Sequence, residues 1–173
     1  GPDTTADWMR EGGQATANLG LSVATAGDVN GDGYDDVVIG APSLTNQYEN
    51  QGRVYIFHGN AGGLAANPQI TLDGTGEGDA LGSAVATAGD VNGDGYADVL
   101  VSAIYYEGFI APTDEGIVYC LHGGAGGVDG VPDWSATGID AYELFGSSLS
   151  LAGDVNGDGF GDVVIGGPGY ENG

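Results

Sequence analysis

A unit of about sixty residues recurs along this chain of 173 residues. The stretch from Ala24 to Tyr34 returns letter for letter from Ala86 to Tyr96, and a close third copy runs from Leu151 to Phe160. The Asp that opens the acidic part of each copy is Asp28, Asp90 or Asp154, at spacings of 62 and 64 residues. A period of this length indicates a repeat architecture in which each unit buries its apolar surface against its neighbours.

Each complete unit holds four short apolar or β-branched runs that are bounded by Gly, Pro, Asn and Asp. In the first unit these runs are 21–25, 37–41, 53–57 and 69–72. Such runs predict strands, and no stretch shows the apolar period of 3.6 that predicts a helix. Four antiparallel strands per unit are typical of a β-propeller blade, with a sandwich or an open antiparallel array as the alternative. The central runs are apolar on both faces, so we expect blades stacked face to face.

The repeat divides the chain into blades at 19–80, 81–144 and 145–173, the last of which holds only two strands. Residues 3–18 contain Asp7–Trp8, which match Asp133–Trp134, and are expected to form an outer strand of a neighbouring or shared blade. Gly1–Pro2 are typical of a cleaved expression tag. The prediction is an all-β, partial propeller of about two and a half to three blades. Propellers have about four blades or more, so further blades of a longer chain or a homo-oligomer would complete the ring.

An acidic loop that reads Asp-x-Asn-x-Asp-Gly-x-x-Asp carries the chemistry of each unit. Side-chain oxygens at positions one, three, five and nine are expected to converge on one point. Position seven is expected to offer its main-chain carbonyl to the same point, so the identity of its side chain should not matter. The Gly at position six permits the positive φ of a tight turn. Oxygen ligands that include three carboxylates suit Ca²⁺ better than Mg²⁺ or Zn²⁺. The predicted ligands of three Ca²⁺ ions are Asp28, Asn30, Asp32, Tyr34 and Asp36; Asp90, Asn92, Asp94, Tyr96 and Asp98; and Asp154, Asn156, Asp158, Phe160 and Asp162.

Three other interpretations of the loop fit the sequence less well. A metal-free loop of Asx turns also favours Asp, Asn and Gly, but its three carboxylates would repel one another. An EF-hand-type loop needs an acidic ligand at position twelve, where this chain has Ile39, Val101 and Ile165. Asp35 beside Asp36 could suggest a catalytic pair, but its counterparts are Ala97 and Gly161, so Asp35 is interpreted as a solvated charge.

The composition excludes several classes of function. The chain has 25 acidic and 2 basic side chains and a net charge of −23, which argues against nucleic acid and anionic lipid as partners. Membrane insertion is not expected, because no apolar run is long enough to cross a bilayer. The chain has 1 Cys, which excludes an internal disulfide framework.

A few further residues are of types that often have functional roles. His58 and His122 share one repeat position and Cys120 lies in an apolar strand, so all three are interpreted as structural and no catalytic residue is predicted. Trp8 and Trp134 are expected to pack between blades or over an edge. The aromatic loop that holds Tyr105, Tyr106 and Phe109 is the best candidate contact surface for a protein or glycan ligand, although its side chains could equally fold back over the blade.

The units resemble FG-GAP repeats, which build the β-propeller of integrin alpha subunits. The resemblance rests on Phe145–Gly146 and on the GlyAlaPro at 40–42, and it weakens at 102–104, which reads SerAlaIle. It implies calcium loops on one face, ligand-binding loops commonly on the opposite face, and an extracellular, secreted or cell-surface setting. The expected function is a calcium-binding, non-enzymatic scaffold for adhesion or protein interaction. The alternatives are a propeller domain of a secreted polysaccharide- or phosphodiester-cleaving enzyme, and a self-assembling structural segment.

Overall fold

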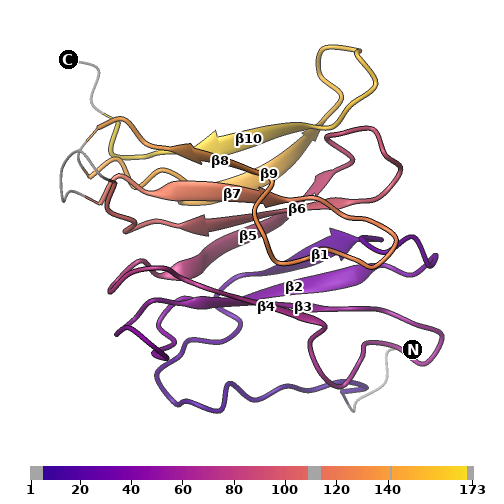
Figure 1. The fold of residues 1–173 in the computed structure, drawn as a ribbon, viewed down its shortest axis with the longest axis horizontal. Coiled ribbons are helices and arrows are strands. Elements are labelled where there is room, and N and C mark those ends of the chain that lie inside the picture. Colours follow the sequence, from indigo (N-terminus) through magenta and orange to yellow (C-terminus); the bar gives the residue numbers. More distant parts are fainter. Residues whose placement is uncertain (1–5, 109–113, 141, 171–173) are drawn as a thin grey trace.

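The computed structural model describes residues 6–108, 114–140 and 142–170, which form three antiparallel sheets stacked in chain order (Figure 1). The first sheet contains β1 (Val23–Gly27), β2 (Asp36–Ala41), β3 (Arg53–Phe57) and β4 (Ile70–Asp73). The second contains β5 (Leu81–Gly89), β6 (Asp98–Ala103), β7 (Ile117–Leu121) and β8 (Trp134–Thr137). The third contains β9 (Ser148–Gly153) and β10 (Asp162–Gly166). The all-β prediction with four-stranded antiparallel blades is confirmed.

Each sheet is a simple meander in which strands pair in chain order. The register repeats between blades, because Val37 lies opposite Phe57 and Val99 lies opposite Leu121. The run predicted at 53–57 coincides with β3, whereas β1 begins two residues after the start of the predicted run at 21–25. No helix among the described residues is long and apolar enough to cross a membrane.

Apolar side chains fill the space between neighbouring sheets. Val38 and Ile56 of the first sheet pack with Val99 and Val101 of the second, and all four are buried. The opposite face of the second sheet packs against the third through a separate cluster that includes Leu100. All six residues of β6 are buried, because this strand lies between two other sheets. Each buried aliphatic side chain contributes about 1.5–3 kcal/mol, so the stack is stabilised mainly by contacts between blades.

Within the described chain, the N-terminal segment packs on the outer face of the first sheet. The ring of Trp8 meets Phe57 edge-on at 5.0 Å between ring centroids, and its indole N–H donates to the carbonyl of Ala65 at 3.1 Å. The predicted outer strand at 3–18 is not observed in its described part, residues 6–18, where the backbone forms no strand. A strand needs a neighbour that accepts its main-chain hydrogen bonds, and here the segment lies on a sheet face instead of at a sheet edge.

The glycines at the start of the second and third blades permit a close approach between sheets. Gly82 has a φ of +92°, and a Cβ there would lie 2.9 Å from the Cα of Gly40 and 2.8 Å from the carbonyl oxygen of Arg53. Gly146, which precedes β9, lies equally close to the second sheet, because a Cβ there would lie 2.7 Å from the Cβ of Ser102. The Gly of the repeat is therefore required both by its backbone conformation and by its neighbour.

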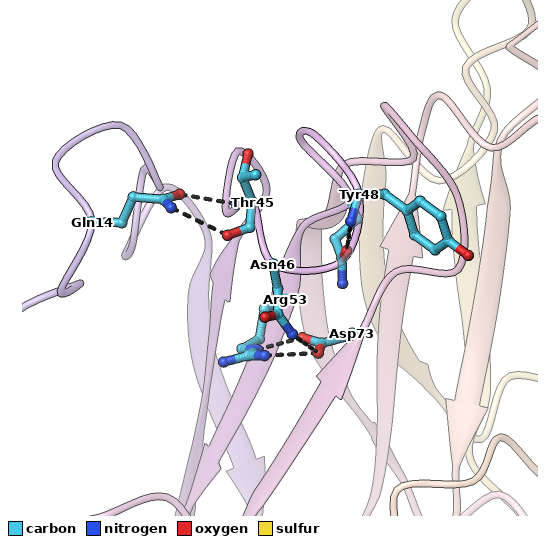
Figure 2. Close-up of polar contacts among 7 residues, drawn as sticks. Gln14, Thr45, Asn46, Tyr48, Arg53 and Asp73 are labelled. Atoms are coloured by element: carbon cyan, nitrogen blue, oxygen red, sulfur yellow. Dashed lines mark hydrogen bonds and ion pairs between the residues drawn. The ribbon is translucent and has the colours of Figure 1, made fainter.

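Polar contacts tie the connections of the first blade at the end of the sheet where β2 leads into β3 (Figure 2). Arg53 and Asp73 form a bidentate ion pair across β3 and β4, with Nη2 to Oδ2 at 2.7 Å, and Asn46 also donates to Asp73 at 3.0 Å. The Gln14 amide bonds to the main chain of Thr45 in both directions, which fixes the N-terminal segment to the β2–β3 connection.

Replacing Gly82→Ala should destabilise the fold by more than Gly20→Ala, which is its matched control. Both glycines have positive φ, at +92° and +86°, but nothing lies within 4 Å of a Cβ at Gly20. The strained backbone costs about 1–2 kcal/mol in both variants, and overpacking adds about 1–3 kcal/mol at Gly82 alone. Denaturant unfolding of the two variants measures this difference. An equal decrease in the free energy of unfolding for both variants would show that the close approach between blades does not contribute to stability.

The Arg53–Asp73 pair should make part of the stability dependent on pH. The hydrogen bond from Arg53 lowers the pKa of Asp73 below its ordinary value and outweighs the opposing effect of burial. A carboxyl with a lowered pKa in the folded state stabilises the fold above its unfolded-state pKa of about 3.9, and this is lost as the pH falls through the folded-state pKa. Asp73→Asn should therefore cost about 1 kcal/mol at neutral pH. The difference in the free energy of unfolding between the variant and wild type should vanish in acid. A difference that does not depend on pH would contradict a stabilising role of the Asp73 carboxylate.

Candidate metal centre

The three acidic loops lie at the same end of the stack, between the first and second strands of each blade (Figure 1). The first loop runs from Asp28 at the end of β1 to Asp36 at the start of β2. Gly33 at its sixth position has a φ of +89°, as the turn requires. Its counterparts Gly95 and Gly159 have φ values of +90° and +93°.

The first Asp of each loop is held by main-chain N–H groups of the same loop. Asp28 Oδ1 accepts from Gly31 and Asp32 at 2.7 and 3.0 Å, and Oδ2 accepts from Gly33 at 2.8 Å. Desolvation raises the pKa of Asp28, but these donors together outweigh it and hold the pKa below its ordinary value. Asp28 is thus a fixed anion whose remaining lone pairs are available to a ligand.

The third and fifth positions of the loop orient one another. Asn30 Oδ1 accepts from the N–H of Asp32 at 2.9 Å, and Asn30 Nδ2 donates to Asp32 Oδ2 at 3.1 Å. Asp32 Oδ1 in turn accepts from the N–H of Tyr34 at 3.0 Å. The second and third loops repeat these bonds to within about 0.2 Å, which shows that the motif fixes one local conformation.

The ninth position is buried in the two complete blades. Asp36 is fully buried and accepts from the N–H of Val29 at 3.0 Å and from that of Gly59 at 2.8 Å. Asp98 is equally buried and accepts from Val91 and Gly123 in the same way. Burial raises the pKa of both carboxyls, although these hydrogen bonds offset part of the effect.

Neither buried carboxyl has a cationic Lys or Arg partner among the described residues, where the only such ion pair is that of Arg53 with Asp73. Buried charges in proteins are generally paired or coordinate a metal. The all-oxygen donor set of the loop, its fixed first Asp and its buried ninth Asp therefore fit a hard cation such as Ca²⁺.

The described part of the chain contains no group of three or more His, Cys, Asp or Glu side chains that could hold a metal ion. In each loop, the oxygens of the first and ninth Asp are directed to main-chain N–H groups as described above. The sequence-based ligand set also depends on an Asn oxygen and a main-chain carbonyl. Convergence of these donors on one point stays a prediction.

The aromatic residue at position seven has a packing role that the sequence reasoning missed. A Cβ on Gly31 of the first loop would lie 2.6 Å from the ring of Tyr96 in the second loop. Gly93 of the second loop meets the ring of Phe160 in the third in the same way, at 2.5 Å. This packing is separate from the carbonyl contribution predicted for position seven, which stays a prediction. The signal for it in the sequence is that all three copies are aromatic there. The loops form a row in which each rests on the one before.

Two acidic residues at the other end of the blades were also missed. Asp79 Oδ2 accepts from the N–H of Thr75 and of Gly76, and Glu143 accepts from the N–H of Ile139 and of Asp140. Both are buried and close the connection that leads into the next blade. The repeat pattern obscured them, because the corresponding position in the N-terminal segment is Ala17.

The other residues considered from the sequence lie outside the acidic loops. Cys120 is buried, and burial raises the pKa of its thiol to about 12. Trp134 is 46% exposed, so it does not pack as Trp8 does. Tyr105 is exposed, whereas Tyr106 packs against the core between the first two blades. Phe109, the third member of the predicted contact surface, lies outside the described residues.

Known proteins contain the same repeat. The FG-GAP repeat matches residues 19–57, 81–119 and 145–173. Integrin alpha pat-2 of Caenorhabditis elegans is 36% identical over 165 residues, which cover 85% of this chain and 13% of that protein. Integrin alpha-6 of Homo sapiens is 34% identical over 157 residues, covering 90% of this chain and 13% of that protein.

A third relative, integrin alpha-5 of Xenopus laevis, is 30% identical over 177 residues, covering 96% of this chain and 16% of that protein. The chain thus spans a small part, between 13% and 16%, of the length of these curated relatives. The repeat matches, together with the stacked four-stranded blades, show that the chain belongs to the FG-GAP repeat family.

Proposed function

We propose that this chain is a calcium-stabilised β-propeller segment that serves as an extracellular or cell-surface scaffold for adhesion or protein interaction. The observation that carries the metal part is the pair of buried carboxyls, Asp36 and Asp98, at the ends of acidic loops without a Lys or Arg partner in the described chain. A cation at each loop would compensate this charge and the repulsion within the loop.

The residues that would hold Ca²⁺ in the first loop are Asp28, Asn30, Asp32 and Asp36 through their side chains, and Tyr34 through its carbonyl. The equivalent residues of the other two loops would hold a second and a third ion. When bound, Ca²⁺ would supply positive charge and tie the start of the second strand to the end of the first. The chain itself contributes the orientation, because main-chain N–H groups already fix Asp28 and Asp36.

The adhesion part rests on similarity to integrin alpha subunits over most of the chain. A ligand, protein or glycan, would meet the end of the blades away from the acidic loops, where β6 leads into β7. Tyr105 is 45% exposed in this connection and is the described residue best placed for such a contact. Because the relatives are much longer, the partner would be bound by this chain together with further blades.

Adding Ca²⁺ to chelator-treated protein should raise the melting temperature. A ligand that binds only the folded state adds about 2.7 kcal/mol per site at a free concentration of about 100 times its dissociation constant. Calorimetric melts in Ca²⁺ and in Mg²⁺ at equal ionic strength would measure the effect. The Mg²⁺ arm controls for simple screening of a chain with a net charge of −23. Equal melting temperatures in the two salts would contradict a calcium site.

Asp32→Asn should abolish one calcium site, whereas Asp35→Asn should leave all three. The two variants remove the same charge from the same exposed stretch, but Asp35 has no counterpart carboxyl in the other loops. Loss of a residue that only hydrogen-bonds to a metal ligand already weakens metal binding by about 10- to 100-fold, and loss of a direct ligand should weaken it at least as much. Calorimetric titration should give a stoichiometry that falls from three to two for Asp32→Asn alone. Equal effects of both variants would show that only net charge matters.

A further inference from the structure

Each acidic loop contains the dipeptide Asn–Gly at its third and fourth positions. An Asn that precedes Gly reacts readily with the main chain, because Gly has no Cβ to hinder the approach of its nitrogen to the side-chain amide carbon. All three glycines are exposed, so water reaches the reacting groups. The loops therefore carry a reactivity that is separate from metal binding. The three pairs are Asn30–Gly31, Asn92–Gly93 and Asn156–Gly157.

The reaction of such a pair runs in two steps. The main-chain nitrogen of Gly31 loses its proton and attacks Cγ of Asn30, and the side-chain nitrogen of Asn30 takes up a proton and leaves as ammonia. The two residues are then joined in a succinimide ring. Water opens the ring at either carbonyl and yields Asp, or isoAsp, in which the main chain runs through the side chain. The net change replaces a neutral amide by a carboxylate.

The nitrogen that must attack is held by a hydrogen bond in the folded loop. The N–H of Gly31 donates to Asp28 Oδ1, with 2.7 Å between nitrogen and oxygen. Loss of the proton would place a negative nitrogen beside a carboxylate, and the repulsion between the two charges disfavours that step. The attack therefore requires the bond between Gly31 and Asp28 to open first.

The side chain that would be attacked is held through both of its polar atoms. Asn30 Oδ1 accepts from the N–H of Asp32 at 2.9 Å, and Asn30 Nδ2 donates to Asp32 Oδ2 at 3.1 Å. Free rotation of this side chain toward the Gly31 nitrogen requires both bonds to break. The second and third loops repeat these bonds, including the one from the Gly nitrogen to the first Asp.

We propose that the Asn–Gly pair of each acidic loop is a site of spontaneous deamidation, which the hydrogen bonds of the folded loop hold in check. The rate at each site is then set by how often its loop opens locally. The product weakens the loop, because a carboxylate at position 30 would face Asp32 Oδ2, to which the Asn30 amide now donates. The proposal goes beyond the proposed function, because the reaction needs water but no metal.

Ageing of the folded and the urea-denatured chain at the same mildly alkaline pH and temperature tests the proposal. Mass spectrometry of proteolytic peptides follows each site, with Asn46 and Asn60, which precede Gln and Ala, as slow references. In the denatured chain, the three Asn–Gly sites should convert faster than both references. In the folded chain, each should convert about tenfold more slowly or less than when denatured. Equal rates in the folded and denatured chains, or no preference for the Asn–Gly sites, would overturn the proposal.

Two variants of the first loop provide the matched comparison. Asp28→Ala removes the acceptor of the Gly31 N–H, whereas the exposed Asp35 side chain bonds to neither residue of the pair in the described chain. Conversion of Asn30 in the folded chain should rise about tenfold in Asp28→Ala and stay unchanged in Asp35→Ala. Equal rates in the two variants would overturn the proposal.

The other two loops of the same molecules serve as internal references. Opening of the first loop alone accelerates only Asn30, whereas unfolding of the whole chain accelerates all three sites together. If Asp28→Ala unfolds the chain, Asp154→Ala makes the same change in the third loop and is followed at Asn156. A folded variant of either kind that leaves the rate at its own Asn unchanged would overturn the proposal.

The effect of the product is tested by Asn30→Asp against Asn60→Asp. Both variants add one carboxylate, but only position 30 faces Asp32 Oδ2. Asn60 accepts from the N–H of Gly62 through its side-chain oxygen, which Asp retains. In buffer with chelator, Asn30→Asp should lower the melting temperature by more than Asn60→Asp does. Equal shifts would overturn the claim that the product weakens the loop. Because these measurements use no bound metal, their outcome is independent of the calcium titrations.

Discussion

Contact between the faces of neighbouring blades is the interaction on which the rest of the molecule depends. A blade of four short strands has apolar side chains on both faces and cannot bury them alone. The same repeat position shows this directly, because Val38 and Leu100 are fully buried between sheets while Val164 on the last sheet is 58% exposed. The glycines that open each blade, with positive φ at Gly82 and Gly146, let the sheets approach closely enough for this packing.

The same stacking brings the acidic loops into one row, which concentrates negative charge at one end of the molecule. Asp36 and Asp98 anchor their loops to the end of the third strand through main-chain N–H groups. These residues would thus have two roles, as structural anchors and as proposed ligands. Three Ca²⁺ ions would change the net charge of −23 by only six units. Most of the net negative charge would therefore remain after three ions are bound.

The sequence predicted those features that a single unit determines. The run at 53–57 forms β3 because its alternating β-branched and aromatic residues favour a strand and lie between Gly52 and Gly59. Features that depend on a neighbour were missed. The segment 3–18 forms no strand in its described part because strand formation needs a sheet edge. The rings of Tyr96 and Phe160 pack on the preceding loop, and Asp79 and Glu143 close connections between blades, so their roles emerge only when blades are stacked.

The three loops share one sequence pattern, yet the structure makes them physically unequal. Asp36 and Asp98 are buried and each accept two hydrogen bonds, whereas Asp162 is partly exposed and has one of the two partners among the residues that the structure describes. An exposed, incompletely fixed carboxylate is better hydrated and loses more freedom when it binds a cation. Asp36 and Asp98 are already fixed, so they would lose less freedom on binding a cation. The attraction between a cation and a buried carboxylate is also stronger, because water screens it less. If the loops bind cations as proposed, we expect the environment supplied by the third strand to influence how strongly each loop does so.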